Sequence, residues 1–180
     1  IQNIKTETEG LVVKEGNLSI EKDQEFLIKS EFLTEIEINE KNSKNYFNYL
    51  KNTKFIKDDL VLKGKLNNNL EVAFDKTFKV KNYKFDSRGN INELKTNLKK
   101  PLKSDFIQKE IDNLIFKDLD FLLRYSSDKK NYIKTKGFYQ TSGTKFQSFD
   151  LENNFLKDNS KVKLNLDFAE SLNFDLINYN

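Results

Sequence analysis

Apolar and polar residues alternate with a period of two along most of this chain. The closing stretch shows this best, because Val162, Leu164 and Leu166 are separated by single polar residues. Similar alternation runs through residues 26–38 and 60–74. A period of two is that of a β-strand with one face toward apolar groups and the other toward water. The pattern therefore predicts a mainly β protein.

Short polar stretches that contain glycine or asparagine interrupt the alternation. They are residues 15–17, 67–69, 87–90 and 142–143. Gly, Asn and Ser favour tight turns, because they tolerate unusual backbone angles or bond to their own backbone. We therefore expect turns between strands at these four places.

Two segments show helical spacing of apolar residues. In residues 43–53, the apolar side chains follow Ser43, a residue type that caps helix N-termini. In residues 104–114, apolar side chains recur every three or four positions, and Asp105 precedes Gln108 as in a capping box. The spacing predicts one short helix near 43–53 and a second near 104–114.

The alternation slips by one residue at several points. In FKVKNYKFD, residues 78–86, the step from Val80 to Tyr83 is three residues, and the same step occurs from Phe116 to Leu119. A third instance runs from Phe146 to Phe149. An inserted residue in a strand is a β-bulge, which bends the strand and re-aims its faces. The slips predict bulges at which the sheet curls.

Composition narrows the classes of function. The chain has 180 residues, with 16 Phe and 7 Tyr, but no His, Cys, Met or Trp. Without His or Cys there is no Ser-His-Asp hydrolase, no thiolate metal site and no disulfide in these residues. The net charge of +3 is spread finely over both signs, which is typical of a solvated face and argues against a nucleic-acid partner.

The organisation of the chain follows from its length and its ends. A length of 180 residues is that of one domain. No apolar run approaches the roughly 18 residues that span a bilayer, and no signal-peptide pattern stands at the amino end. Because position 1 is not Met, we expect residues 1–180 to be a single β-rich segment of a longer chain.

Adjacent carboxylates are the remaining candidates for catalysis. They form three pairs: Asp58 with Asp59, Asp118 with Asp120, and Glu35 with Glu37. A carboxylate pair can serve as general acid and base when it lines a cleft. Each pair here stands where an acidic residue would cap a turn or line the wet face of a strand. We therefore expect no enzyme, no cofactor and no metal site.

The apolar face of the strands is the strongest candidate for a functional surface. We expect its lining to be Phe26, Ile28, Phe32, Leu62, Leu66, Val72, Phe74, Phe78, Val80, Phe116, Phe121, Leu164, Leu166, Phe168, Phe174 and Leu176. Two short helices are too few to cover so many strands. The expected architecture is an elongated, twisted, largely antiparallel sheet curled into a groove. The alternative is an ordinary closed core in a structural or adhesive β module of an envelope or surface protein.

The rhythm of the strands resembles a known family. The stretches LKGKLNN, FKVKNYKFDSRGNIN, IKTKGFYQTSGTKFQSFDLENNF, KVKLNLDF and LNFDLINY look like a segment of the AsmA-like proteins of the Gram-negative envelope, especially those related to YhdP and TamB. The resemblance covers residues 60–180. It rests on amphipathic strands with an apolar-polar-apolar-Asn rhythm and glycine turns.

The resemblance implies a function and a location. It implies a periplasmic β-groove, anchored to the inner membrane by parts of the parent chain outside this segment. The groove would hold phospholipid acyl chains for transport toward the outer membrane. The family has no catalytic residues to transfer to this chain, so only the apolar lining matches it.

Overall fold

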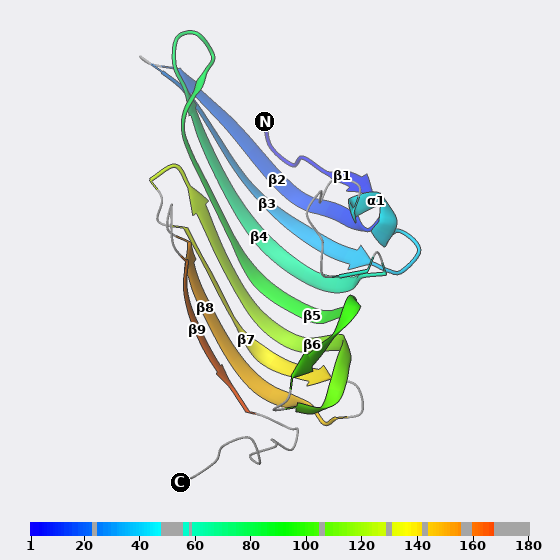
Figure 1. The fold of residues 1–180 in the computed structure, drawn as a ribbon. Coiled ribbons are helices and arrows are strands. Elements are labelled where there is room, and N and C mark those ends of the chain that lie inside the picture. The colour runs from blue at the N-terminus through cyan, green and yellow to red at the C-terminus, as the bar shows by residue number, and fades with distance from the viewer. Residues whose placement is uncertain are drawn as a thin grey trace.

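Nine strands form one antiparallel sheet in which strand order follows the sequence (Figure 1). The computed structural model describes residues 1–22, 25–47, 56–57, 59–104, 107–128, 131–141, 144–155 and 160–167. The strands are β1 (Thr6–Thr8), β2 (Leu11–Lys22), β3 (Phe26–Ile38), β4 (Val61–Phe74), β5 (Val80–Ser104), β6 (Ile107–Ser126), β7 (Asn131–Thr141), β8 (Gln147–Phe155) and β9 (Ser160–Leu166). β1 and β9 are its edges, so the sheet is not closed into a barrel. The predicted mainly β, antiparallel architecture is confirmed.

The register divides the sheet into two faces of opposite character. On β4, Leu62, Leu66 and Leu70 point to one face, whereas alternate positions such as Lys65 and Asn67 point to the other. Directly paired residues of antiparallel strands share a face. The pairing therefore extends both surfaces across all the strands. We call the face of Leu66 the apolar face and the face of Lys65 the charged face.

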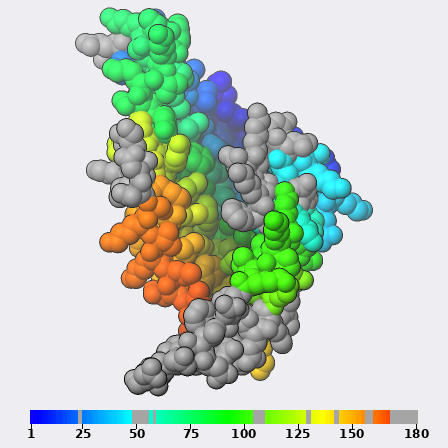
Figure 2. Space-filling view, in the orientation of Figure 1, coloured from blue at the N-terminus to red at the C-terminus, as the bar shows by residue number. Residues whose placement is uncertain are grey.

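The apolar face is the hollow side of the sheet. Figure 2 looks into this hollow, which has β8 and β9 on one side and the ends of β5 and β6 on the other. Asn68 and Ser87 lie in mid-strand on the apolar face and are only 5% and 2% exposed. No second layer of strands covers them within the described residues. Neighbouring side chains bury them, because side chains converge on the inner side of a curved sheet.

Two of the three predicted bulges are confirmed. Phe74 pairs with Val80 and Ala73 with Asn82, which leaves Lys81 as the extra residue. Val80 and Tyr83 therefore point to the same apolar face, although they are three residues apart. The extra residue lets β5 bend without losing its apolar side.

The second confirmed bulge lies in β6, between Lys117 and Asp120. Lys117 pairs with Phe138 and Asp120 with Lys136, so two residues of β6 face one residue of β7. Asp118, one of the two, has a positive φ of 51°. The slip again places Phe116 and Leu119 on the apolar face.

The third predicted bulge is wrong. Phe146 precedes β8, which begins at Gln147, so the step from Phe146 to Phe149 spans the start of a strand. Register shifts that were not predicted occur at Lys14 in β2 and at Asn92 in β5. The step from Ile91 to Leu94 is three residues, so the slip at Asn92 was visible in the alternation but was not listed among the predicted bulges.

Three of the predicted turns are wrong, because strands run straight through them. Residues 15–17 lie within β2, residues 67–69 within β4 and residues 87–90 within β5. The glycines there serve close contact between strands: a Cβ on Gly89 would stand 2.1 Å from the backbone oxygen of Lys65. Asn68 donates its side-chain amide to neighbouring acceptors on β3 and β4. Residues 142–143 lie outside the described residues.

The helix predictions had different outcomes. A helix does begin at Ser43, as α1 (Ser43–Phe47), while residues 48–53 lie outside the described residues. The helix predicted near 104–114 is wrong, because Ser104 ends β5 and β6 begins at Ile107. Ile107 pairs with Ser104, and Ile111 with Leu102. The far end of β5 pairs with this segment at separate positions, with register shifts between them, and this pairing outweighs the helical spacing of a short segment.

The hydrophobic core is small. Among the described residues, the buried hydrophobic side chains are Ile38, Phe47, Ile91, Leu98 and Leu119. Phe47 comes from α1, and Leu98 makes an isolated bridge with Ile56. The core therefore gathers near the α1 end of the sheet, and much of the apolar face remains half-buried or exposed.

Candidate functional site

The predicted lining residues gather on one surface. Those that lie in strands are all on the apolar face: Phe26, Ile28, Phe32, Leu62, Leu66, Val72, Phe74, Val80, Phe116, Phe121, Leu164 and Leu166. Phe78 instead lies in the turn between β4 and β5. Phe168, Phe174 and Leu176 lie outside the described residues. That the lining binds lipid stays a prediction.

The sequence-based list omitted other members of the same face. They include Leu11, Val13, Leu18, Ile20, Ile36, Leu70, Phe85, Leu94, Leu114, Leu123, Ile133, Phe149, Leu151, Phe155 and Val162. Most follow the same alternation and were available from it. Leu94 follows Ile91 by a step of three residues, because the bulge at Asn92 shifts its phase, and this slip resembles those at Val80 and Phe116.

Aromatic rings contact one another along the apolar face. Phe149 meets Phe116 edge to face at 5.4 Å between ring centroids, and meets Tyr139 at 6.2 Å. Tyr83 stacks on Tyr125 with ring centroids 5.6 Å apart. The hydrogen bond between the two side chains raises the pKa of Tyr83. Such pairs add about 0.5–1.5 kcal/mol beyond simple burial. They order the lining, although no second layer of strands within the described ranges packs on it.

The polar side chains that interrupt this surface are uncharged on four of its strands. The positions of β3, β4, β7 and β8 on the apolar face carry no charged side chain. Asn68 is satisfied, since its amide bonds to Phe32 O and Thr34 Oγ1. The hydroxyls of Ser87 and Thr135 are buried and have no hydrogen-bond partner within the described residues. The surface is thus suited to apolar ligands without strict positional preference.

The apolar surface is least covered at its margins. On the edge strand β9, Val162 and Leu164 are 56% and 51% exposed. At the end near the β4–β5 turn, Ile20 and Val80 are 62% and 54% exposed. Exposed apolar groups that adjoin one another are typical of interaction surfaces.

The charged face is crossed by ion pairs between neighbouring strands. Glu35 accepts from Lys65 at 2.7 Å and from Lys14 at 3.2 Å. The hydrogen bond from Lys65, followed by that from Lys14, lowers the pKa of Glu35. Lys63 pairs with Glu93 at 3.4 Å. Opposite charges directly across strands stabilise the pairing modestly.

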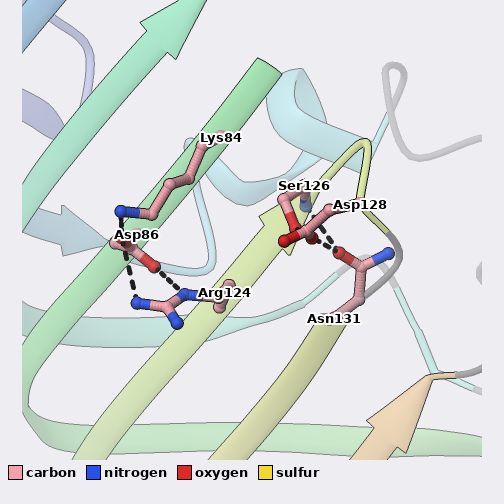
Figure 3. Close-up of polar contacts among 6 residues, drawn as sticks. All are labelled: Lys84, Asp86, Arg124, Ser126, Asp128 and Asn131. Carbon is pink, nitrogen blue, oxygen red and sulfur yellow. Dashed lines mark hydrogen bonds and ion pairs between the residues drawn. The ribbon is translucent and has the colours of Figure 1, made fainter. Parts of the chain in front are cut away.

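The best-buried of these pairs joins β5 to β6 (Figure 3). Arg124 Nε lies 2.6 Å from Asp86 Oδ1, and Lys84 Nζ lies 3.0 Å from Asp86 Oδ2. Burial acts to raise the pKa of Asp86, but the hydrogen bonds from Arg124 and Lys84 outweigh it, so the pKa is lowered. Beside it, Ser126 bonds to Asp128 and Asn131 and closes the β6–β7 turn.

The carboxylate pairs are placed by the structure as follows. Asp118, Asp120 and Asp150 border a shallow pocket of about 500 Å³ that lies largely on the charged face. Asp120 is 60% exposed and pairs with Lys136 at 3.2 Å. A solvated ion pair of this kind lacks the desolvation that tunes a carboxyl for acid catalysis.

In each of the other two carboxylate pairs, one member is bound to a neighbouring side chain. Glu35 is held by its two lysines, whereas Glu37 is exposed. Asp59 accepts a hydrogen bond from Asn97 Nδ2 at 2.6 Å, and Asp58 lies outside the described residues. In the part of the chain that the structure describes, no three acidic side chains gather as a metal site would require.

No helix within the described ranges has the length and hydrophobicity to span a membrane. The chain matches no family model, no curated protein and no solved structure. The resemblance to the AsmA-like family therefore remains a prediction from the rhythm of the strands.

Proposed function

We propose that the apolar face binds the acyl chains of lipids without catalysis. The observation that carries this proposal is a nine-stranded sheet whose hollow side is apolar and has no second layer over it in the described residues. An apolar surface left open in water is costly, so it requires an occupant. A flexible hydrocarbon chain suits a long, curved surface that offers no charged anchor on β3, β4, β7 and β8.

The binding would be passive. Each methylene transferred from water to the apolar face contributes about 0.8 kcal/mol. Because the lining of β3, β4, β7 and β8 has no charge, similar chains bind with similar affinity and slide along it. The head groups would remain at the margins, near the lysines and asparagines of the charged face.

The biological setting follows from the resemblance to AsmA-like proteins. We propose a periplasmic segment that carries phospholipid between inner and outer membranes, with membrane attachment through other parts of the parent protein. The alternative, a structural or adhesive module with a closed core, would need a layer over the apolar face. Among the described residues, the only helix is the short α1.

Lipid extraction tests the proposal directly. The purified chain is expected to carry phospholipid that organic solvent extracts and mass spectrometry identifies. After delipidation, a fluorescent fatty acid should bind and be displaced by unlabelled lipid. Protein that is free of lipid and also fails to bind the fatty acid would overturn the proposal. A lipid-free oligomer in light scattering would favour the closed-core alternative.

A further inference from the structure

The turn between β4 and β5 displays an aromatic side chain at one end of the sheet. Figure 1 shows this turn reaching beyond the arrowhead of β6. Phe78 lies in the turn and is 69% exposed, more than any other aromatic side chain among the exposed hydrophobic residues. Its ring stacks on Phe26 with centroids 4.8 Å apart. One side of the ring is therefore held by the sheet while the rest projects into solvent.

The backbone of the turn holds Phe78 in a strained conformation. Its φ is 60°, in the left-handed region that bulky residues avoid. The carboxylate of Asp75 accepts hydrogen bonds from the Thr77 N–H at 2.7 Å and from the Lys79 N–H at 3.1 Å. The Phe78 N–H donates to the Asp75 carbonyl oxygen. An aromatic residue kept at this position by a well-bonded turn indicates that its exposure is built into the fold.

Lysines lie on either side of Phe78 in the sequence of the turn. Lys76 and Lys79 are exposed and form no ion pair within the described residues. Lys81 pairs with Glu25. Lys22 lies over the Phe26 ring, 5.2 Å from its centroid. Asp75 and Glu25 remain anionic, but these four lysines outnumber them among the described residues, so the net charge offered to a partner at this tip is positive.

We propose that this tip, formed by Phe78, Lys76 and Lys79, docks on the surface of a bilayer that contains anionic lipids. An aromatic ring between lysines matches the boundary between acyl chains and negatively charged head groups. The exposed side chains of Ile20 and Val80 continue the apolar face toward the tip. The apolar face would then open beside the membrane surface. Docking itself does not depend on acyl-chain binding along the sheet.

Vesicle co-sedimentation of the full chain tests this. The chain is expected to bind vesicles of phosphatidylcholine with phosphatidylglycerol more tightly than pure phosphatidylcholine vesicles, and raised salt should release it. Phe78→Asn should weaken the binding about tenfold, because the ring's burial is lost. Asn tolerates a positive φ, so the turn is retained. Replacing Lys76 and Lys79 with Gln should cost about fivefold for each lysine.

Phe138→Asn provides the matched control. Phe138 is 46% exposed but lies on the charged face, away from the tip. The Phe138→Asn variant should bind vesicles as tightly as the wild type. Circular dichroism should show that all variants are folded. The proposal is wrong if the wild-type chain ignores vesicles, does not prefer anionic ones, or loses no affinity with Phe78→Asn. Fatty-acid binding measured in solution without vesicles reports on the proposed function separately, so the two can fail independently.

Discussion

Two adjacent leucines of β6 point to opposite faces and provide a matched test of where lipid binds. Leu123 pairs with Ser87 on the apolar face, whereas Leu122 pairs with Arg88 and Lys134 on the charged face. Both side chains are half-buried. We expect Leu123→Asp to weaken acyl-chain binding and Leu122→Asp to leave it unchanged.

The magnitude follows from burial. Full burial of a leucine side chain is worth about 1.5–3 kcal/mol, and Leu123 is already half-buried, so about 1 kcal/mol remains for the ligand to supply. Placing a carboxylate beneath a hydrocarbon chain costs at least about 1 kcal/mol more. The sum of about 2 kcal/mol corresponds to binding weakened about thirtyfold.

Competition with a fluorescent fatty acid measures this difference. Urea unfolding of each variant shows whether a change in affinity reflects loss of fold. Leu122→Asp should remain folded, since Arg88 and Lys134 flank the new carboxylate and partly offset the lost burial of the leucine. Equal affinities of the two variants, or a larger loss with Leu122→Asp, would refute the assignment of the apolar face as the binding surface.

Three further predictions concern the stability of the sheet. Asp86→Asn removes a carboxylate whose pKa is lowered from its usual 3.8 by Arg124 and Lys84 against the effect of burial. At neutral pH, the variant should be less stable than the wild type by about 1 kcal/mol or less. As pH falls below about 4, the wild type should lose this advantage, because its carboxylate becomes protonated. Urea titrations across this pH range measure both effects. A variant with unchanged pH dependence would contradict this. Gly89→Ala should lower the free energy of unfolding by about 1–3 kcal/mol, because the added Cβ would meet the Lys65 backbone oxygen. A variant as stable as the wild type would show that the two strands can move apart there. Ser87→Ala should be neutral or slightly stabilising in the same assay, since its buried hydroxyl has no partner; a large loss would reveal a hydrogen bond that the structure does not show.

Periodicity predicted much of the fold because it reports a local property. A strand that is apolar on one side must alternate with a period of two, and a bulge must add one residue to that period. For this reason the slips near Val80 and near Phe116 were visible in the sequence. The apolar face could likewise be identified strand by strand.

The errors arose where neighbouring strands overrode local preference. Gly16, Gly89 and residues 67–69 resemble turns, but each lies inside a strand. A single sequence does not distinguish a glycine in a turn from a glycine inside a strand that lets the neighbouring strand come close. The segment near 104–114 has helical spacing, yet it pairs at several positions with the far end of β5 through an irregular register. Such ladders depend on residues far apart, which local patterns do not report.

The sequence by itself determined that the chain forms amphipathic strands, that their apolar sides belong together, and that no His or Cys is available for chemistry. These properties depend on residue type and short spacing alone. Only the tertiary structure decided the register, the hollow side and the exposure of Phe78 at the tip. Those features arise from pairing and curvature over the whole sheet, because the burial of each side chain depends on the strands beside it.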